Sequence, residues 1–383
     1  MLIRSKRVWV ANKFLACIVS VKEDKIEKIL PYDADVKVDY DFGNDRVVPG
    51  FIDVHTHGAV KYDTLDADEQ GLKRWAKYLP SEGVVAFLPT TVTQTEEVLV
   101  KASKSVANVV RENDYEGARI LGINFEGPFL DVAYKGAQPE QCIVKPDIEQ
   151  FYRFQEAADG LIKIITMSLN KDEDYKMTRE LASQDIIVSI GHGGTTYEEA
   201  ILGFANGARL MTHTFNGMTG LHQRMPGQVG ASMRVRDEFA EIICDGIHIH
   251  PDVMNTYFKS KGPDYAVMVS DSISAKAVDP NDEFYLGGER VYIHPDGSAR
   301  RANGGLSGST AKIIQGLKTC VVDAEIPFSY AINSCTINPA RLLRIDDRKG
   351  KIKANYDADL VVIDDNYEIV KTMVLGKFLY SRD

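Results

Sequence analysis

The feature that most limits how this chain can fold is a series of eight short apolar runs in its middle, separated by segments with helical character. The runs cover residues 51–58, 84–92, 120–129, 162–169, 186–194, 208–217, 239–248 and 265–273. Apolar runs of this length that end in turn residues are typical of buried strands. Residues 95–113 show the helical pattern, with Thr95 and two acids at their start. Eight buried strands alternating with helices predict an α/β fold, a (β/α)8 TIM barrel.

The two ends of the chain show a different pattern. Residues 1–48 and 345–383 contain short segments in which polar and apolar residues alternate and β-branched residues are frequent. This pattern is typical of strands, so the two ends together predict one small β domain beside a barrel formed by residues 49–344. A chain of 383 residues is long enough for a barrel with such an appendage.

Charge and cysteine usage narrow the class of protein. Lys and Arg number 45 against 55 Asp and Glu, a net charge of −10 with no basic stripe, which argues against a nucleic-acid partner. An anionic substrate would therefore need local donors rather than an overall field. The five cysteines are widely spaced, and neither a signal peptide nor a long apolar run is evident. We therefore expect a cytoplasmic protein with reduced thiols and no membrane partner.

Ionisable side chains occur late in the apolar runs, where strands of a barrel would end. They are His55, His57, Glu126, His192, His213, His248 and Asp271. Active sites of such barrels lie at the carboxyl ends of the strands, so these groups should converge on one mouth. The sequence thus predicts a site rich in imidazole and carboxylate groups.

The His55-Thr-His57 pattern is the strongest local signal for a metal. Alternate residues of a strand point the same way, and imidazole binds zinc, iron or nickel well. The alternative is a pair of hydrogen-bonded polar histidines near a loop. Glu126 is hard to bury unpaired, so it forms either a salt bridge or a carboxylate bridge between two metals.

The remaining strand-end groups complete this hypothesis. His192 and His213 each follow an apolar run, and a single such histidine is more often structural than a ligand. Together with Glu126 and the His-x-His pair, we interpret both as metal ligands. Asp271 could accept a proton from water, or it could cap a following helix. The glycine-rich run 303–310 either approaches a ligand with its backbone or starts a helix capped by Ser307 or Ser309.

At this point the chain resembles the amidohydrolase superfamily and, within it, the N-acetylglucosamine-6-phosphate deacetylases. The motifs are VVPGFIDVHTHG (47–58), NFEGPFL (124–130), KGAQP (135–139), GHGGTTYEEA (191–200), THTFNGM (212–218), DGIHIHP (245–251), VSDSISAKA (269–277), LSGST (306–310) and DADLVVID (357–364). The first of these marks only the superfamily. The EGPF, THTFNGM and LSGS strings are more specific to the deacetylases.

This resemblance implies a barrel with a small β-sandwich, and metal-dependent removal of the acetyl group from N-acetylglucosamine 6-phosphate. The implied metal ligands are Glu126, His192 and His213, with His55 and His57 completing a second position in members that carry both histidines. Asp271 matches the general base and acid. The implied substrate-binding residues are Ala137, Gln138, Asn216, Gly217, Arg224, His248, Leu306, Ser307 and Gly308. We expect one or two divalent ions per subunit, drawn from Zn, Fe, Co, Mn and Ni.

Several alternatives remain open at this stage. Gln138 stands where members of the family can carry a histidine that points at the substrate carbonyl; an amide can still donate a hydrogen bond there, but it carries no charge. N-acetylgalactosamine 6-phosphate is a rival substrate, and a non-catalytic scaffold is a rival class. The resemblance also implies a homodimer in which phosphate contacts cross the subunit interface.

Overall fold

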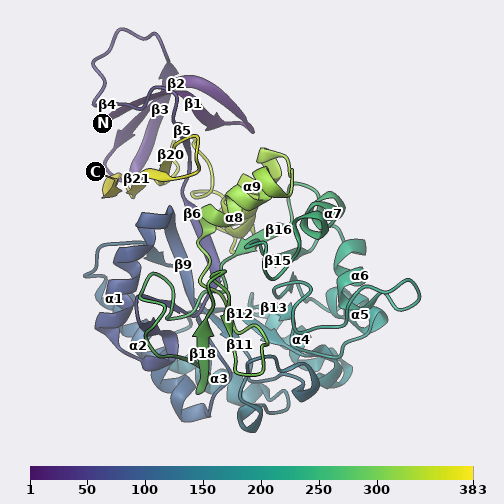
Figure 1. Ribbon diagram of the computed structural model, residues 1–383. Coiled ribbons are helices and arrows are strands. Elements are labelled where there is room, and N and C mark those ends of the chain that lie inside the picture. The colour runs from purple at the N-terminus through teal and green to yellow at the C-terminus, as the bar shows by residue number, and fades with distance from the viewer. Residues whose placement is uncertain (383) are drawn as a thin grey trace.

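The computed structural model describes residues 1–382, and its centre is a barrel of parallel strands (Figure 1). Each of the eight predicted runs contains one barrel strand. The strands are β6 (Phe51–Thr56), β9 (Val84–Thr91), β11 (Ile123–Glu126), β12 (Ile162–Met167), β13 (Ile187–Ile190), β14 (Leu210–Met211), β15 (Phe239–Ile243) and β16 (Ala266–Val269). They pair in parallel in this order, and the short strand β10 (Arg119–Ile120) adds to β9. The predicted (β/α)8 barrel is confirmed.

Helices follow the strands and cover the outside of the barrel. They are α1 (Glu69–Tyr78), α2 (Glu96–Glu112), α3 (Ile148–Ala157), α4 (Lys176–Ser183), α5 (Tyr197–Ala205), α6 (Gly227–Arg234), α7 (Pro251–Lys261), α8 (Ile313–Lys318), α9 (Phe328–Cys335) and α10 (Ile337–Leu342). The helix expected over 95–113 is α2, with Thr95 at its N-cap position. Neighbouring strand residues serve different cores: Ile165 packs with the helices, whereas Ile164 joins a cluster shared with residues of other barrel strands.

The two ends of the chain meet in one antiparallel and mixed sheet at the top of Figure 1, where both termini lie. From the N-terminal end come β1 (Leu2–Val10), β2 (Lys13–Lys22), β3 (Lys25–Pro31), β4 (Tyr40–Asp41) and β5 (Arg46–Pro49). From the C-terminal end come β20 (Leu360–Ile363), β21 (Ile369–Val374) and β22 (Lys377–Ser381). The pairing of β20 with β5 joins the two ends, because all four residues of β20 face β5.

An insertion after β16 forms a small sheet that the sequence did not reveal. It consists of β17 (Phe284–Leu286), β18 (Glu289–Ile293) and β19 (Ala299–Arg300). A two-stranded hairpin of β7 (Gly58–Ala59) and β8 (Tyr62–Asp63) follows the first barrel strand. The run 303–310 consists of turns, bends and isolated bridges, and α8 begins only at Ile313, so the alternative in which this run starts a helix is wrong.

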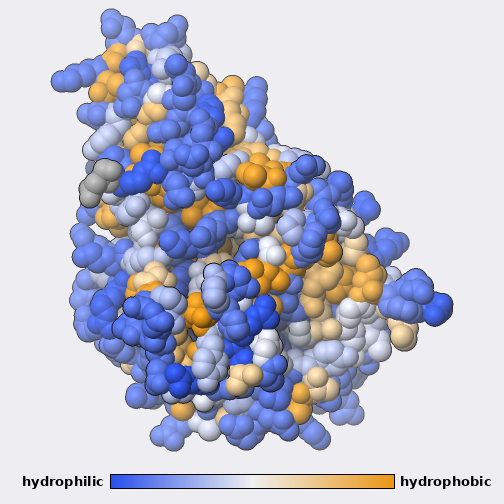
Figure 2. Space-filling view, viewed as in Figure 1, coloured by the Kyte–Doolittle hydropathy of each residue, from blue (hydrophilic) through white to orange (hydrophobic). Residues whose placement is uncertain are grey.

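Hydrophilic side chains cover most of the face shown in Figure 2. The loop that leads into α6 projects from the barrel at the right of Figure 1, and its Leu221 and Met225 are exposed. Within residues 1–382, none of the helices combines the length and the apolar character needed to cross a membrane.

Candidate active site

A cavity of about 160 Å³ lies at the carboxyl ends of the barrel strands and brings most of the predicted site residues together. Its lining consists of His57, Glu126, Gly136, Ala137, Gln138, His192, His213, Asn216, Gly217, His248, Asp271, Leu286, Leu306, Ser307 and Gly308. His55 lies behind this lining and is fully buried. Arg224 does not line the cavity, because it sits in the exposed loop before α6.

Glu126, His192 and His213 form the first group of converging ligand atoms. Glu126 Oε1 lies 3.0 Å from His192 Nε2 and 2.8 Å from His213 Nε2, and the two Nε2 atoms are 3.1 Å apart. His192 Nδ1 lies 2.9 Å from the Tyr134 carbonyl, which fixes Nδ1 as the donor and leaves the Nε2 lone pair for the centre of the group. Three buried lone-pair atoms this close together fit a cation.

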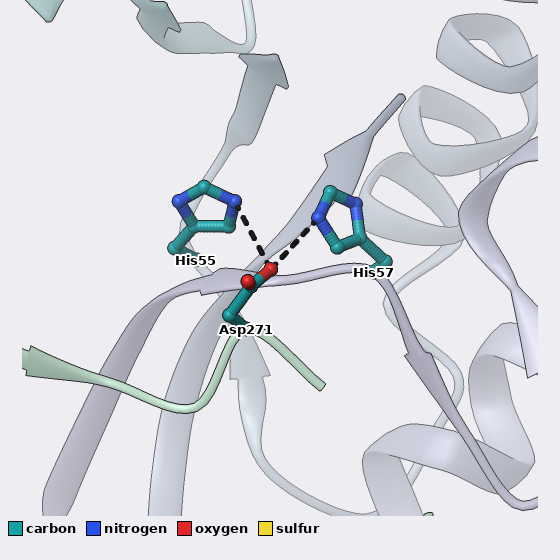
Figure 3. A group of neighbouring side chains, drawn as sticks. All are labelled: His55, His57 and Asp271. Carbon is teal, nitrogen blue, oxygen red and sulfur yellow. Dashed lines mark ion pairs between the residues drawn. The ribbon is translucent and has the colours of Figure 1, made fainter. Parts of the chain in front are cut away.

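His55, His57 and Asp271 form the second group, shown in Figure 3. Asp271 Oδ1 lies between the rings, 3.1 Å from His57 Nε2 and 3.6 Å from His55 Nε2. Glu126 reaches this group too, with Oε1 3.6 Å from His55 Nε2 and Oε2 3.5 Å from His57 Nε2. Glu126 therefore lies between both groups, where it could bridge two metals.

Three of these residues have backbone conformations that residues other than glycine seldom adopt. The φ angles are 43° at His192, 24° at His213 and 50° at Asp271. Such conformations persist only where the surrounding structure holds them, and they concentrate at functional sites. No α-helix begins close after Asp271, within the residues that the structure describes, so the helix-cap alternative for this carboxylate is wrong.

Glu241 is a site residue that sequence reasoning missed. It lies on β15, it is fully buried, and its Oε2 accepts hydrogen bonds from His55 Nδ1 at 2.9 Å and from the His213 backbone N–H at 3.0 Å. Donation from Nδ1 turns the His55 Nε2 lone pair toward the second group, where Nε2 has no hydrogen-bond partner within residues 1–382. The available signal was an acid inside the apolar run 239–248, where an unpaired charge is costly.

The electrostatics of the two groups agree with a site for cations. Burial raises the pKa of Glu126, but the His192 and His213 rings outweigh this and hold it well below its usual range. Burial likewise raises the pKa of Asp271, while hydrogen bonding from His57 and the charge of His55 lower it below the usual value. Burial lowers the pKa of His55, but Glu241, Glu126 and Asp271 raise it to about 10. The ionised carboxylates thus favour the binding of positive charge between the two ligand groups.

Gln138 has an amide whose two ends are both fixed. Its Oε1 accepts a hydrogen bond of 2.7 Å from the Thr93 backbone N–H, and its Nε2 donates to Glu126 Oε2. Because the Thr93 N–H can only donate, the amide must face this way round. Gln138 therefore contacts a ligand group directly, a contact that sequence reasoning did not anticipate.

His248 lines the same cavity, together with Asn216 and the 306–308 segment. Its Nδ1 is 2.7 Å from Asp245 Oδ2, and Asp245 Oδ1 accepts the backbone N–H groups of Ile247 and His248. Burial lowers the pKa of His248, but the Asp245 carboxylate raises it above its ordinary value. The raised pKa favours the protonated, positively charged form of this ring, which can bind an anion in the cavity.

Comparison with known proteins agrees with this geometry. The family model described as "Amidohydrolase family" matches residues 46–379. An N-acetylglucosamine-6-phosphate deacetylase of Bacillus subtilis is 34% identical over 91% of this chain and 88% of its own. An N-acetylgalactosamine-6-phosphate deacetylase of Escherichia coli O157:H7 is 30% identical over 86% of each chain.

Solved structures show the same relationship. An aspartate-to-alanine mutant of N-acetyl-D-glucosamine-6-phosphate deacetylase from Mycobacterium smegmatis, in complex with N-acetyl-D-glucosamine-6-phosphate, superimposes with a TM-score of 0.94 at 25% identity over 100% of this chain and 99% of its own. The N-acetylglucosamine-6-phosphate deacetylase of Thermotoga maritima gives a TM-score of 0.89 at 27% identity over all of both chains. With its barrel, its ligand groups and a family match over most of its length, the chain belongs to the amidohydrolase family.

Proposed function

We propose that this chain removes the acetyl group from N-acetyl-D-glucosamine 6-phosphate by hydrolysis, giving acetate and D-glucosamine 6-phosphate. The observation that carries the proposal is the convergence of two ligand groups and Asp271 on one cavity. The names of the relatives in Bacillus subtilis and Mycobacterium smegmatis support the substrate. Because Asp271 and both ligand groups are present, a scaffold without catalysis is disfavoured.

The ligand groups fit a divalent metal, one or two per subunit. Glu126, His192 and His213 would hold one ion, and His55 and His57, with Glu126 or Asp271 as the carboxylate, would hold the other. Such ions activate water and polarise a carbonyl oxygen. Imidazole and carboxylate ligands of this kind suit Zn, Fe, Co, Mn or Ni.

In this proposal Asp271 moves the proton. Its Oδ1 faces the two imidazoles of the His-x-His strand, which leaves Oδ2 to accept a proton from the attacking water. The lowered pKa of Asp271 keeps it ionised and ready to accept this proton at neutral pH. Asp271 then returns the proton to the amide nitrogen, because an amine leaves far more easily than its anion.

The sugar and its phosphate would occupy the other side of the cavity. His248, held by Asp245, offers a positively charged donor, and Asn216, Gly217 and the 306–308 segment offer polar and backbone contacts. Arg224 lies outside the cavity of its own subunit, on the projecting loop before α6. We propose that in a homodimer this loop brings Arg224 to the phosphate site of the partner.

The test of this function is acetate release by the purified protein with N-acetylglucosamine 6-phosphate. Activity should disappear with a chelator and return with added divalent metal. Absence of acetate release from the metal-loaded protein would refute the proposal. The 4-epimer, N-acetylgalactosamine 6-phosphate, is the second candidate because of the Escherichia coli O157:H7 relative, and the ratio of the two kcat/KM values decides between them.

Cytoplasmic residence is part of the same proposal. All five cysteines are buried and free, with no disulfide among the described residues, as expected for a protein kept in a reducing compartment. Fractionation of the source cells, with the protein detected by antibody, tests this assignment.

A further inference from the structure

Lys276 and Glu82 form an ion pair that is completely buried, and the chemistry above does not use it. Lys276 Nζ lies 2.8 Å from Glu82 Oε1, and both side chains have an exposed fraction of 0%. Lys276 lies five residues after Asp271 in the segment that follows β16. Glu82 ends the short 3-10 helix Leu79–Glu82, which leads into β9.

Burying this ion pair costs desolvation free energy that the attraction between the two charges can fail to recover. Within residues 1–382, neither the Lys276 ammonium nor the Glu82 carboxylate has a well-aligned hydrogen bond to another group, although the two charges touch. Apolar side chains of the same volume often stabilise a fold as well as such a pair or better. Stabilisation of the fold therefore does not by itself account for this buried pair.

The segment that carries Asp271 depends on contacts with β6 and the turn after it. Among the described strands, no ladder joins β16 to β6, so the barrel closes here through individual hydrogen bonds. The Asp271 N–H donates to the His55 carbonyl at 2.9 Å, and the His57 N–H donates to the Ser272 carbonyl at 2.7 Å. Farther along, the Val60 N–H donates to the Lys276 carbonyl at 2.9 Å.

Two side-chain anchors bracket this run of bonds. On the near side of Asp271, Ser270 Oγ donates to Asp53 Oδ2 at 2.6 Å, which fastens the end of β16 to β6. On the far side, the ion pair of Lys276 with Glu82 fastens the end of the segment to the entry of β9. Asp271, with its φ of 50°, lies between the anchors, and a strained conformation needs such restraint on both sides.

We propose that Lys276 is a positioning residue: its ion pair with Glu82 holds the 270–276 segment so that the Asp271 carboxylate keeps its place against the His-x-His strand. The inference rests on the proposed function of Asp271 as the proton carrier. It assigns no contact with substrate to either Lys276 or Glu82.

The test compares turnover with stability in three variants. Lys276→Met and Glu82→Gln each remove one charge of the buried pair, so both should lower the melting temperature. Both should also lower kcat by roughly 10²-fold, a loss that a misplacement of about 1 Å can cause. KM and metal content per subunit should stay near wild type. The double variant Glu82→Gln, Lys276→Met removes both charges, so its melting temperature should recover while kcat stays low.

Recovery of kcat together with the melting temperature in the double variant would overturn the proposal, because the pair would then act only through stability. Lys261→Met is the matched control. Lys261 is also a buried lysine, but its ammonium is bound by backbone carbonyls at the end of α6. That variant should lose stability without the 10²-fold loss of kcat.

A double-mutant cycle with Asp271→Asn gives a second test, which does not depend on the folding of the Lys276→Met variant. If Lys276 acts through Asp271, adding Glu82→Gln to Asp271→Asn should change the residual turnover by less than about twofold. A full 10²-fold further loss would contradict the proposal.

Hydrogen exchange separates failure of this inference from failure of the proposed function. In Lys276→Met and Glu82→Gln, amides of residues 270–277 should exchange faster than in wild type, with no comparable change in α2. This result is expected whatever the substrate. Unchanged exchange in the segment would refute the anchor even if acetate release is confirmed.

Discussion

Glu241 offers the sharpest test of how the metal site is held. Its Oε2 accepts the bonds from His55 Nδ1 and from the His213 N–H, whereas its Oε1 has no hydrogen-bond partner among the described residues. In Glu241→Gln the amide oxygen can take the place of Oε2 and keep both bonds. The variant therefore removes the negative charge, while the side chain keeps its shape and its two bonds from His55 Nδ1 and the His213 N–H.

The size of the effect follows from the two kinds of hydrogen bond. A bond to a charged group contributes about 1.5–3 kcal/mol and a neutral one about 0.5–1.5 kcal/mol, so the His55 bond should weaken by roughly 1–1.5 kcal/mol. That difference corresponds to about a tenfold weaker metal affinity. In the metal-free protein burial lowers the pKa of His55, but Glu241 together with Glu126 and Asp271 raises it to about 10, so a proton competes with the metal. The electrostatic attraction of the Glu241 carboxylate is about twice as large for a divalent ion as for a proton. Removing this charge therefore weakens metal binding more than it weakens proton binding.

The assay is competition for Zn²⁺ or Co²⁺ between the protein and a chromophoric chelator at pH 7. Glu238→Gln is the control, since Glu238 lies just before the same strand and is absent from the cavity lining. We expect about a tenfold loss for Glu241→Gln and no loss for the control. Equal metal affinity in wild type and Glu241→Gln, with both proteins folded, would refute the argument that the Glu241 charge supports the His55 ligand.

Three further predictions concern the same cavity. Asp271→Asn should lower kcat by roughly 10²–10⁴-fold while metal content and substrate binding persist, and loss of the metal would instead make Asp271 mainly a ligand. Wild type should bind two metals per subunit after saturation and desalting, and the double variant His55→Gln, His57→Asn should bind one; one metal in both proteins would refute the two-metal arrangement. Asp245 raises the pKa of His248 above the unfolded value of about 6.5, so the stability from this pair is complete below that pH and is lost as the pH rises through the folded pKa. The difference in melting temperature between wild type and His248→Gln should therefore shrink above pH 6.5, and a constant difference from pH 5 to 9 would contradict this coupling.

The sequence alone determined the barrel and most of the candidate site. Each apolar run became one strand because a strand buried on both faces must be apolar along its length, and that pattern is local. Side chains such as Glu126 and His213 could be placed at the mouth because the carboxyl ends of parallel strands all lie at one end of a barrel. These inferences need only the order of residues and the geometry of one fold.

The groups that support those side chains became evident only in the folded chain. Glu241 reaches His55 across 186 positions of sequence, and the amide of Gln138 is fixed by a backbone N–H of Thr93. The ion pair of Lys276 with Glu82 likewise joins segments that the sequence does not link. Such contacts have no periodic pattern, because a partner of a buried polar group is chosen by proximity in space and by the cost of leaving that group unpaired.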